Sequence, residues 1–89
     1  MTIKRLRIER RGGFAGLPAV GEREFHELSP AQQDALHRLL AAPPSPAPSP
    51  GADRFHYDVH VVDDTGTREL KVPEHAMPAE LASIPKIQL

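Results

Sequence analysis

The chain has 89 residues, a formal net charge of −1 and no cysteine. That length gives one small domain over residues 1–89, which buries about 60–65% of its unfolded surface and has no room for a lidded active site. Without cysteine there is no disulfide framework, thiol nucleophile or cysteine-based zinc site. The near-neutral charge argues against a nucleic-acid partner. No apolar stretch approaches the ~20 residues that span a bilayer and no secretory signal is apparent, so we expect a cytoplasmic protein without a membrane partner.

The first predicted elements are two strands joined by a glycine-rich turn. Leu6 and Ile8 alternate with charged residues, a period of two that is typical of a half-buried strand. Residues 19–25 predict a second strand, which Gly21 weakens. The simplest arrangement is a hairpin with the glycine-rich turn at its tip.

A helix and a proline-rich segment follow. Ser29 is a predicted N-cap and Gln32 completes a capping box, with a proline at the first helical position between them. The helix must end by Ala42, because Pro43 and Pro44 cannot continue it. Residues 43–52 hold half of the chain's ten prolines and predict an exposed, extended loop.

The second half predicts a further hairpin and a short helix. Residues 54–62 and 67–72 alternate as strands, and the Asp-Asp-Thr-Gly sequence at 63–66 indicates the turn between them. A short helix begins near Pro78 and ends before Pro85. The predicted fold class is α+β, a small, mainly antiparallel sheet of about four strands with two helices in the order β-β-α-β-β-α. The predicted core is Leu6, Ile8, Leu36, Leu39, Leu40, Phe55, Tyr57, Val59, Val61, Leu70, Val72 and Leu81.

No residue pattern predicts catalysis or a resident metal. His56, Asp58 and His60 share one strand face, but the two imidazoles are about 13 Å apart at their bases, too far to converge on one ion. We interpret them as the polar outer face of a half-buried strand. Glu74-His75 is not part of a zinc-protease HExxH motif. We therefore expect no enzyme, no cofactor and no metal ion of its own.

The glycine-rich turn is the most informative segment. It runs Gly12, Gly13, Phe14, Ala15, Gly16, Leu17 and has the spacing of neither a dinucleotide-binding loop nor a P-loop. Turns are usually polar, yet this one carries two large apolar side chains between glycines. They either fold back as a plug or stand out as an anchor for a partner.

Several of these motifs together resemble the emfourin family. They are Arg10 followed by Gly-Gly-Phe-Ala-Gly at 12–16, the Phe-His-Tyr sequence at 55–57, and Val-Pro-Glu at 72–74 with Pro78 and Leu81. Emfourin-like proteins are bacterial inhibitors of protealysin-like, thermolysin-family zinc metalloproteases. The proline-rich loop departs from the pattern.

The resemblance implies a protease inhibitor whose Gly12–Leu17 turn fills a pocket suited to Phe14 or Leu17. Inhibition of a zinc enzyme also favours a carboxylate of the inhibitor as an oxygen ligand for the target's zinc. Asp53 is the preferred candidate, and it lies beside the glycine-rich turn if the third strand starts there. If that strand runs the other way, Asp63 and Asp64 lie there instead.

The partner expected from this resemblance is a protealysin-like metalloprotease, and the free inhibitor is expected to be a monomer, although an exposed edge strand could pair with its copy. The alternative is a non-inhibitory protein–protein interaction module that docks through the same turn.

Overall fold

A computed structural model describes residues 2–12, 19–43 and 55–87. Its sheet contains β1 (Ile3–Gly12), β2 (Ala19–Glu24), β3 (Phe55–Asp63), β4 (Gly66–Pro73) and β5 (Lys86–Ile87). Its helices are α1 (Pro30–Ala41) and α2 (Ala79–Ala82), with 3₁₀ turns η1 (Phe25–Glu27) and η2 (Glu74–Ala76).

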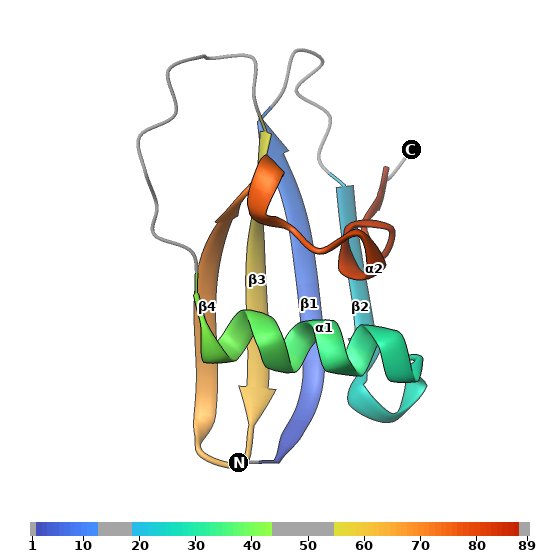
Figure 1. Ribbon diagram of the computed structural model, residues 1–89, viewed down its shortest axis with the longest axis vertical. Helices are drawn as coiled ribbons and strands as arrows, with labels where there is room; N and C mark the ends of the chain where they lie inside the picture. The colour runs from blue at the N-terminus through green and yellow to red at the C-terminus, as the bar shows by residue number, and fades with distance from the viewer. Residues whose placement is uncertain (1, 13–18, 44–54, 88–89) are drawn as a thin grey trace.

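The strands form one antiparallel sheet in the order β4-β3-β1-β2-β5 (Figure 1). The predicted α+β class and its order of four main strands and two helices are confirmed, and the short β5 is added. The first strand of the chain is central, with β2 on one side and β3 on the other. In the pairing of β1 with β3, Gly12 lies opposite Phe55 at one end and Ile3 opposite Asp63 at the other.

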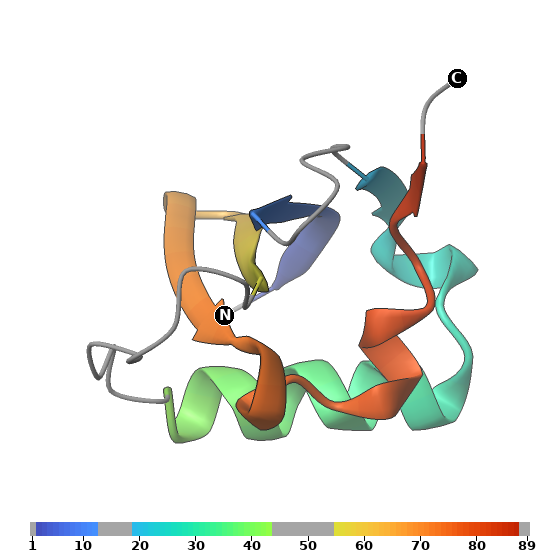
Figure 2. The same ribbon diagram turned by 90° about the horizontal axis from the view of Figure 1, so that it is seen from above.

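The helices lie on one face of the sheet, as Figure 2 shows from above. Leu36 and Leu39 of α1 pack there with Leu6, Ile8 and Val59 of the sheet. The opposite face, called the open face below, is covered by no described helix. In the part of the chain that the structure describes, no helix has both the length and the apolar character to cross a bilayer.

The predicted core is largely confirmed, with additions from connecting segments. Leu70 is only half-buried, since it lies on the edge strand β4, and the Phe55 side chain lies outside the described part. Residues that join the predicted core are Ile3, Ala19, Leu28, Ala35, Met77 and Ile84.

Helix α1 begins as predicted. The Gln32 amide donates to Ser29 Oγ at 3.2 Å, and the Ser29 amide donates to Gln32 Oε1 at 2.9 Å. The same type of box begins η1, where the Glu24 amide donates to Glu27 Oε1 at 2.8 Å. This second box ends β2 at Glu24, one residue earlier than predicted.

Gly21 allows the C-terminal segment to pack directly on β2. A Cβ atom at this position would lie 2.4 Å from the backbone oxygen of Ile84, closer than real contacts allow. The residue that weakened the strand prediction is therefore the point of close approach between β2 and the chain that leads into β5.

Candidate functional site

Five described residues meet at one end of the sheet, here named the loop end: Gly12, Ala19, Phe55, Pro73 and Ile87. Ala19 pairs with Ile87, Gly12 with Phe55, and Pro73 with a residue next to Phe55. β1 ends here, and β2 and β3 begin here (Figure 1). Gly12 has φ +84°, a backbone conformation that favours glycine.

Most predicted site residues lie outside the described part of the chain. These are Gly13, Phe14, Ala15, Gly16, Leu17 and Asp53. What the structure gives is the position of the backbone on either side of them. The structure places the start of β3 beside Gly12, and the role of Asp53 stays a prediction.

Asp63 and Asp64 lie at the other end of the sheet, here named the turn end. A strand rises about 3.3 Å per residue, so about 26 Å of β3 separates Phe55 from Asp63. Asp63 Oδ1 accepts hydrogen bonds from the amide and hydroxyl of Thr65 at 2.7 and 2.6 Å. The Asp64 amide donates to the backbone oxygen of Thr2, and the Thr2 amide donates to Asp64 Oδ1, both at 3.1 Å. The Asp63 carboxylate is thus engaged within the β3–β4 turn, and the Asp64 carboxylate fastens Thr2 to that turn.

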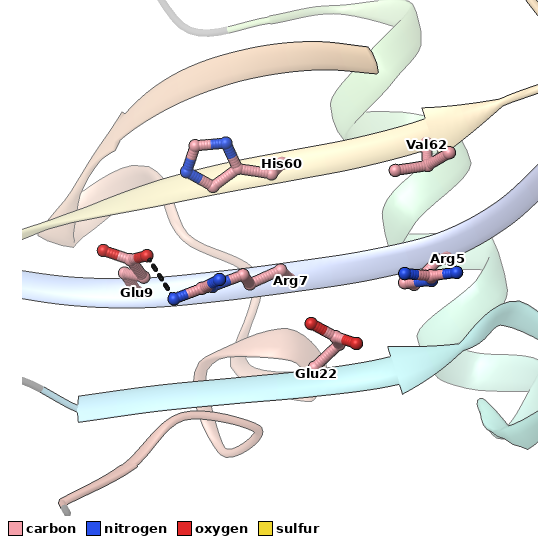
Figure 3. A pocket seen from close by; sticks show the side chains of 6 residues that line it. All are labelled: Arg5, Arg7, Glu9, Glu22, His60 and Val62. Carbon is pink, nitrogen blue, oxygen red and sulfur yellow. Dashed lines mark ion pairs between the residues drawn. The ribbon is translucent and has the colours of Figure 1, made fainter. Parts of the chain in front are cut away.

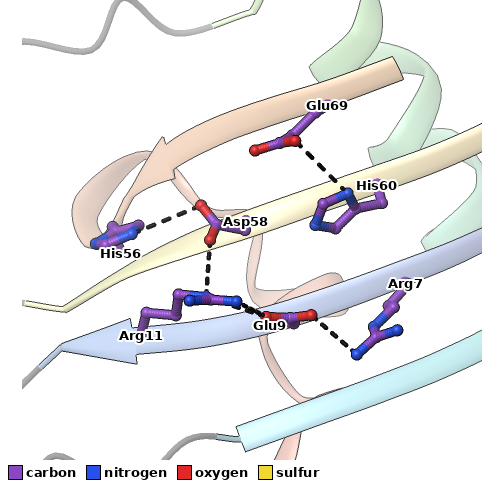
Figure 4. A network of polar contacts seen from close by, with 7 residues as sticks. All are labelled: Arg7, Glu9, Arg11, His56, Asp58, His60 and Glu69. Carbon is purple, nitrogen blue, oxygen red and sulfur yellow. Dashed lines mark hydrogen bonds and ion pairs between the residues drawn. The ribbon is translucent and has the colours of Figure 1, made fainter. Parts of the chain in front are cut away.

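The open face carries a network of charged side chains near the loop end (Figure 4). Arg11 Nε donates to Glu9 Oε2 at 3.0 Å and lies 3.0 Å from Asp58 Oδ2. Arg7 Nη2 lies 2.9 Å from Glu9 Oε1, and His56 Nε2 lies 3.6 Å from Asp58 Oδ1. The hydrogen bond from Arg11 is the main reason that the pKa of Glu9 falls below its ordinary value.

The histidines of β3 take part in separate contacts. His56 faces Asp58, whereas His60 Nδ1 lies 3.9 Å from Glu69 Oε2 on the neighbouring strand. Among the described residues, no group of three or more His, Cys, Asp or Glu side chains is placed to hold a metal ion.

A hollow of about 280 Å³ lies over the middle of the open face (Figure 3). Its lining residues are Arg5, Arg7, Glu9, Glu22, His60 and Val62. Because both signs of charge meet in it, the hollow has no single-sign lining of the kind that a phosphate or a metal cation requires.

On the face of the sheet that the helices cover, three of the residues that carry the family resemblance form a cross-strand row near the loop end: Arg10, Tyr57 and Val72. Arg10 lies opposite Ala19 on β2 and opposite Tyr57 on β3, and Tyr57 lies opposite Val72 on β4. Burial is the largest influence on Tyr57 and raises the pKa of its hydroxyl, while the charge of Arg10 and a hydrogen bond from it act in the opposite direction. Motifs that are far apart in the sequence therefore converge on one cross-strand row.

The sequence model of the Emfourin family matches residues 8–86, nearly the whole chain. The chain belongs to the emfourin family. It is accordingly a protein inhibitor of metalloproteases, its partner is a protease, and the family is one of inhibitors rather than enzymes. No curated protein and no solved structure matches it significantly.

Sequence reasoning missed the contacts among Arg11, Glu9 and Asp58 in this emfourin. The alternation within each strand does assign these side chains to outer faces. It carries no information on which residue of β1 lies opposite which residue of β3, because that register depends on how the long intervening chain folds. The sequence signal for these contacts was the position of Arg11 directly before the glycine-rich turn.

Proposed function

We propose that this emfourin inhibits a protealysin-like, thermolysin-family zinc metalloprotease by presenting Gly12–Leu17 to the active-site cleft. Thermolysin-like enzymes favour bulky apolar side chains just after the scissile bond, as the family resemblance implies. Phe14 and Leu17 are the apolar side chains that meet this requirement, and the adjoining glycines allow close approach of the backbone.

The observation that carries the proposal is the pairing of Gly12 with Phe55. It brings the two chain segments that hold the candidate binding residues to the same end of the sheet. In this proposal Asp53, two residues before Phe55, supplies a carboxylate oxygen toward the target's zinc, since carboxylates are common zinc ligands. In this proposal Asp63 and Asp64 do not take that role, because they lie at the opposite end of the sheet from Gly12.

The test is inhibition of thermolysin by matched variants. Burying one large apolar side chain stabilises a complex by roughly 1.5–3 kcal/mol, so we expect Phe14→Ala to raise the inhibition constant about ten- to a hundredfold. Thermal melting of the free protein should change little. If Phe14→Ala unfolds the protein and leaves inhibition by the folded fraction unchanged, Phe14 is a plug rather than an anchor.

The carboxylate is tested by Asp53→Asn, with Asp64→Asn as the matched control at the turn end. We expect a large rise of the inhibition constant for the first variant and none for the second. An effect of Asp64→Asn equal to that of Asp53→Asn would contradict the assignment. Binding to the protease without inhibition would instead favour the interaction module that docks through the same turn.

We further propose that the free inhibitor is a monomer. The edge strand β4 carries Glu69 and Lys71 on the open face. Charges on an edge strand disfavour pairing with another chain. Sedimentation equilibrium over a range of concentrations tests this, and a mass near twice 9.8 kDa would refute it.

A further inference from the structure

Two carboxylates face one another on the open face, near the loop end. Glu9 of β1 and Asp58 of β3 are direct register partners, and their side chains are only 13% and 10% exposed. Like charges directly opposite each other on neighbouring strands are destabilising, and partial burial strengthens that repulsion. The pair therefore requires a cation between its members.

Arg11 is that cation. Its guanidinium contacts both carboxylates, with Nε 3.0 Å from Glu9 Oε2 and 3.0 Å from Asp58 Oδ2 (Figure 4). The planar fork of arginine suits such a bridge better than the single ammonium of lysine. Apart from His56 Nε2 at 3.6 Å, Asp58 has little other support, since its buried Oδ1 accepts no hydrogen bond from any described residue.

The bridge lies where both candidate binding segments begin. Arg11 directly precedes Gly12, whose φ of +84° turns the chain out of β1. Asp58 lies on β3 three residues after Phe55, the residue opposite Gly12. The Arg11 guanidinium thus links the last part of β1 to the first part of β3 by contacts between side chains.

We propose that Arg11 is a positioning residue that holds the ends of β1 and β3 at a fixed separation, so that the segments 13–18 and 44–54 are presented together. The proposal rests on the proposed function, in which these segments bind a metalloprotease. Arg11 acts through Glu9 and Asp58 and makes no contact with the protease.

The experiment compares Arg11→Met with Arg5→Met as thermolysin inhibitors. Arg5 lies on the same strand and face, its side chain is 50% exposed against 58% for Arg11, and its ion pair with Glu24 lies toward the turn end. We expect Arg11→Met to raise the inhibition constant about tenfold and Arg5→Met to leave it within about twofold. Equal effects of the two substitutions would overturn the proposal.

A triple variant separates positioning from direct contact. In Glu9→Gln/Arg11→Met/Asp58→Asn the repulsion is absent and the two amides can hydrogen-bond to each other. If Arg11 positions the strand ends, this variant should recover most of the inhibition that Arg11→Met loses. If Arg11 touches the protease, no recovery occurs and the proposal is wrong. The triple variant also carries the test if Arg11→Met fails to fold.

Hydrogen exchange of the free protein provides a readout that does not depend on the protease. We expect faster exchange in Arg11→Met at residues 9–12 and 56–58, with unchanged exchange in α1. Uniform acceleration over the whole protein, or none, would contradict a local positioning role. If the wild type does not inhibit thermolysin at all, the proposed function fails for that enzyme, while the exchange pattern still decides the role of Arg11.

Discussion

The two ends of the sheet are held together by different kinds of contact. At the turn end, Asp63 bonds to Thr65 within the same turn, and Thr2 is fastened to the adjacent Asp64. At the loop end, Arg11 bridges to Asp58 on another strand of the sheet. The turn end is held by hydrogen bonds of Asp63 to Thr65 and of Asp64 to Thr2, whereas the loop end is held by ion pairs between charged side chains of β1 and β3. That difference suits the proposed function, in which two segments at the loop end bind the protease together.

The largest effect on stability is expected from Gly21→Ala, which would disturb the packing of the C-terminal segment on β2. The added Cβ would meet the Ile84 backbone, so Ile84 and β5 must move away from β2. Overpacking of this kind costs about 1–3 kcal/mol, which should lower Tm by roughly 5–15 °C in a domain of this size. Calorimetry checks the shift, and an unchanged Tm would show that the close approach of Ile84 is not needed.

The substitutions Gly12→Ala and Gly66→Ala test the two ends of the sheet separately. Gly12 and Gly66 have φ of +84° and +140°, so alanine is strained at both, and we expect a loss of about 1 kcal/mol of stability in each case. Gly66→Ala meets no atom within 4 Å, which leaves backbone strain as its main cost. Inhibition should weaken only in Gly12→Ala, because only Gly12 lies at the loop end. Equal inhibition constants for the two variants would contradict the assignment of binding to that end.

The smallest effect is a pH dependence that belongs to the turn end. Hydrogen bonds from the Thr65 hydroxyl and then its amide hold the pKa of Asp63 below its ordinary value of 3.8. The folded state therefore binds this proton less readily than the unfolded chain. The resulting stabilisation is present above that ordinary value and is lost as the pH falls through the lower pKa of the folded state.

We accordingly expect the Tm of the wild type to fall more steeply below pH 4 than that of Asp63→Asn, which cannot titrate at this position. Thermal melts recorded by circular dichroism in steps of pH would measure the two slopes. Parallel curves would mean that Asp63 contributes nothing to acid sensitivity.

Elements with a strong local signal could be predicted from the sequence. The capping box of Ser29 and Gln32 specifies the start of α1, and alternation around Val59 specifies β3 and its buried face. Elements that depend on their neighbours could not. The two residues of β5 are too short for any period, and Leu70 is half-buried because β4 lies at the edge, a position that its own alternation does not reveal.

The candidate site divides in the same way. The unusual composition of Gly12–Leu17 marks that segment directly, because large apolar residues between glycines conflict with ordinary turn chemistry. The contact of Arg11 with Asp58 could not be found in advance, since it requires the register between β1 and β3. The structure supplies the direction of β3, and the choice of Asp53 over Asp63 stays a prediction.

The position of Thr2 determines how this protein can be attached to a surface or fused to a reporter. Its backbone pairs with Asp64 at the turn end, whereas Ile87 pairs with Ala19 at the loop end. A biotin, affinity tag or fluorescent fusion placed ahead of Thr2 would project away from the proposed protease-binding segments. The same group attached after Ile87 would crowd them, so immobilised-inhibitor assays should be tethered through the N-terminal side.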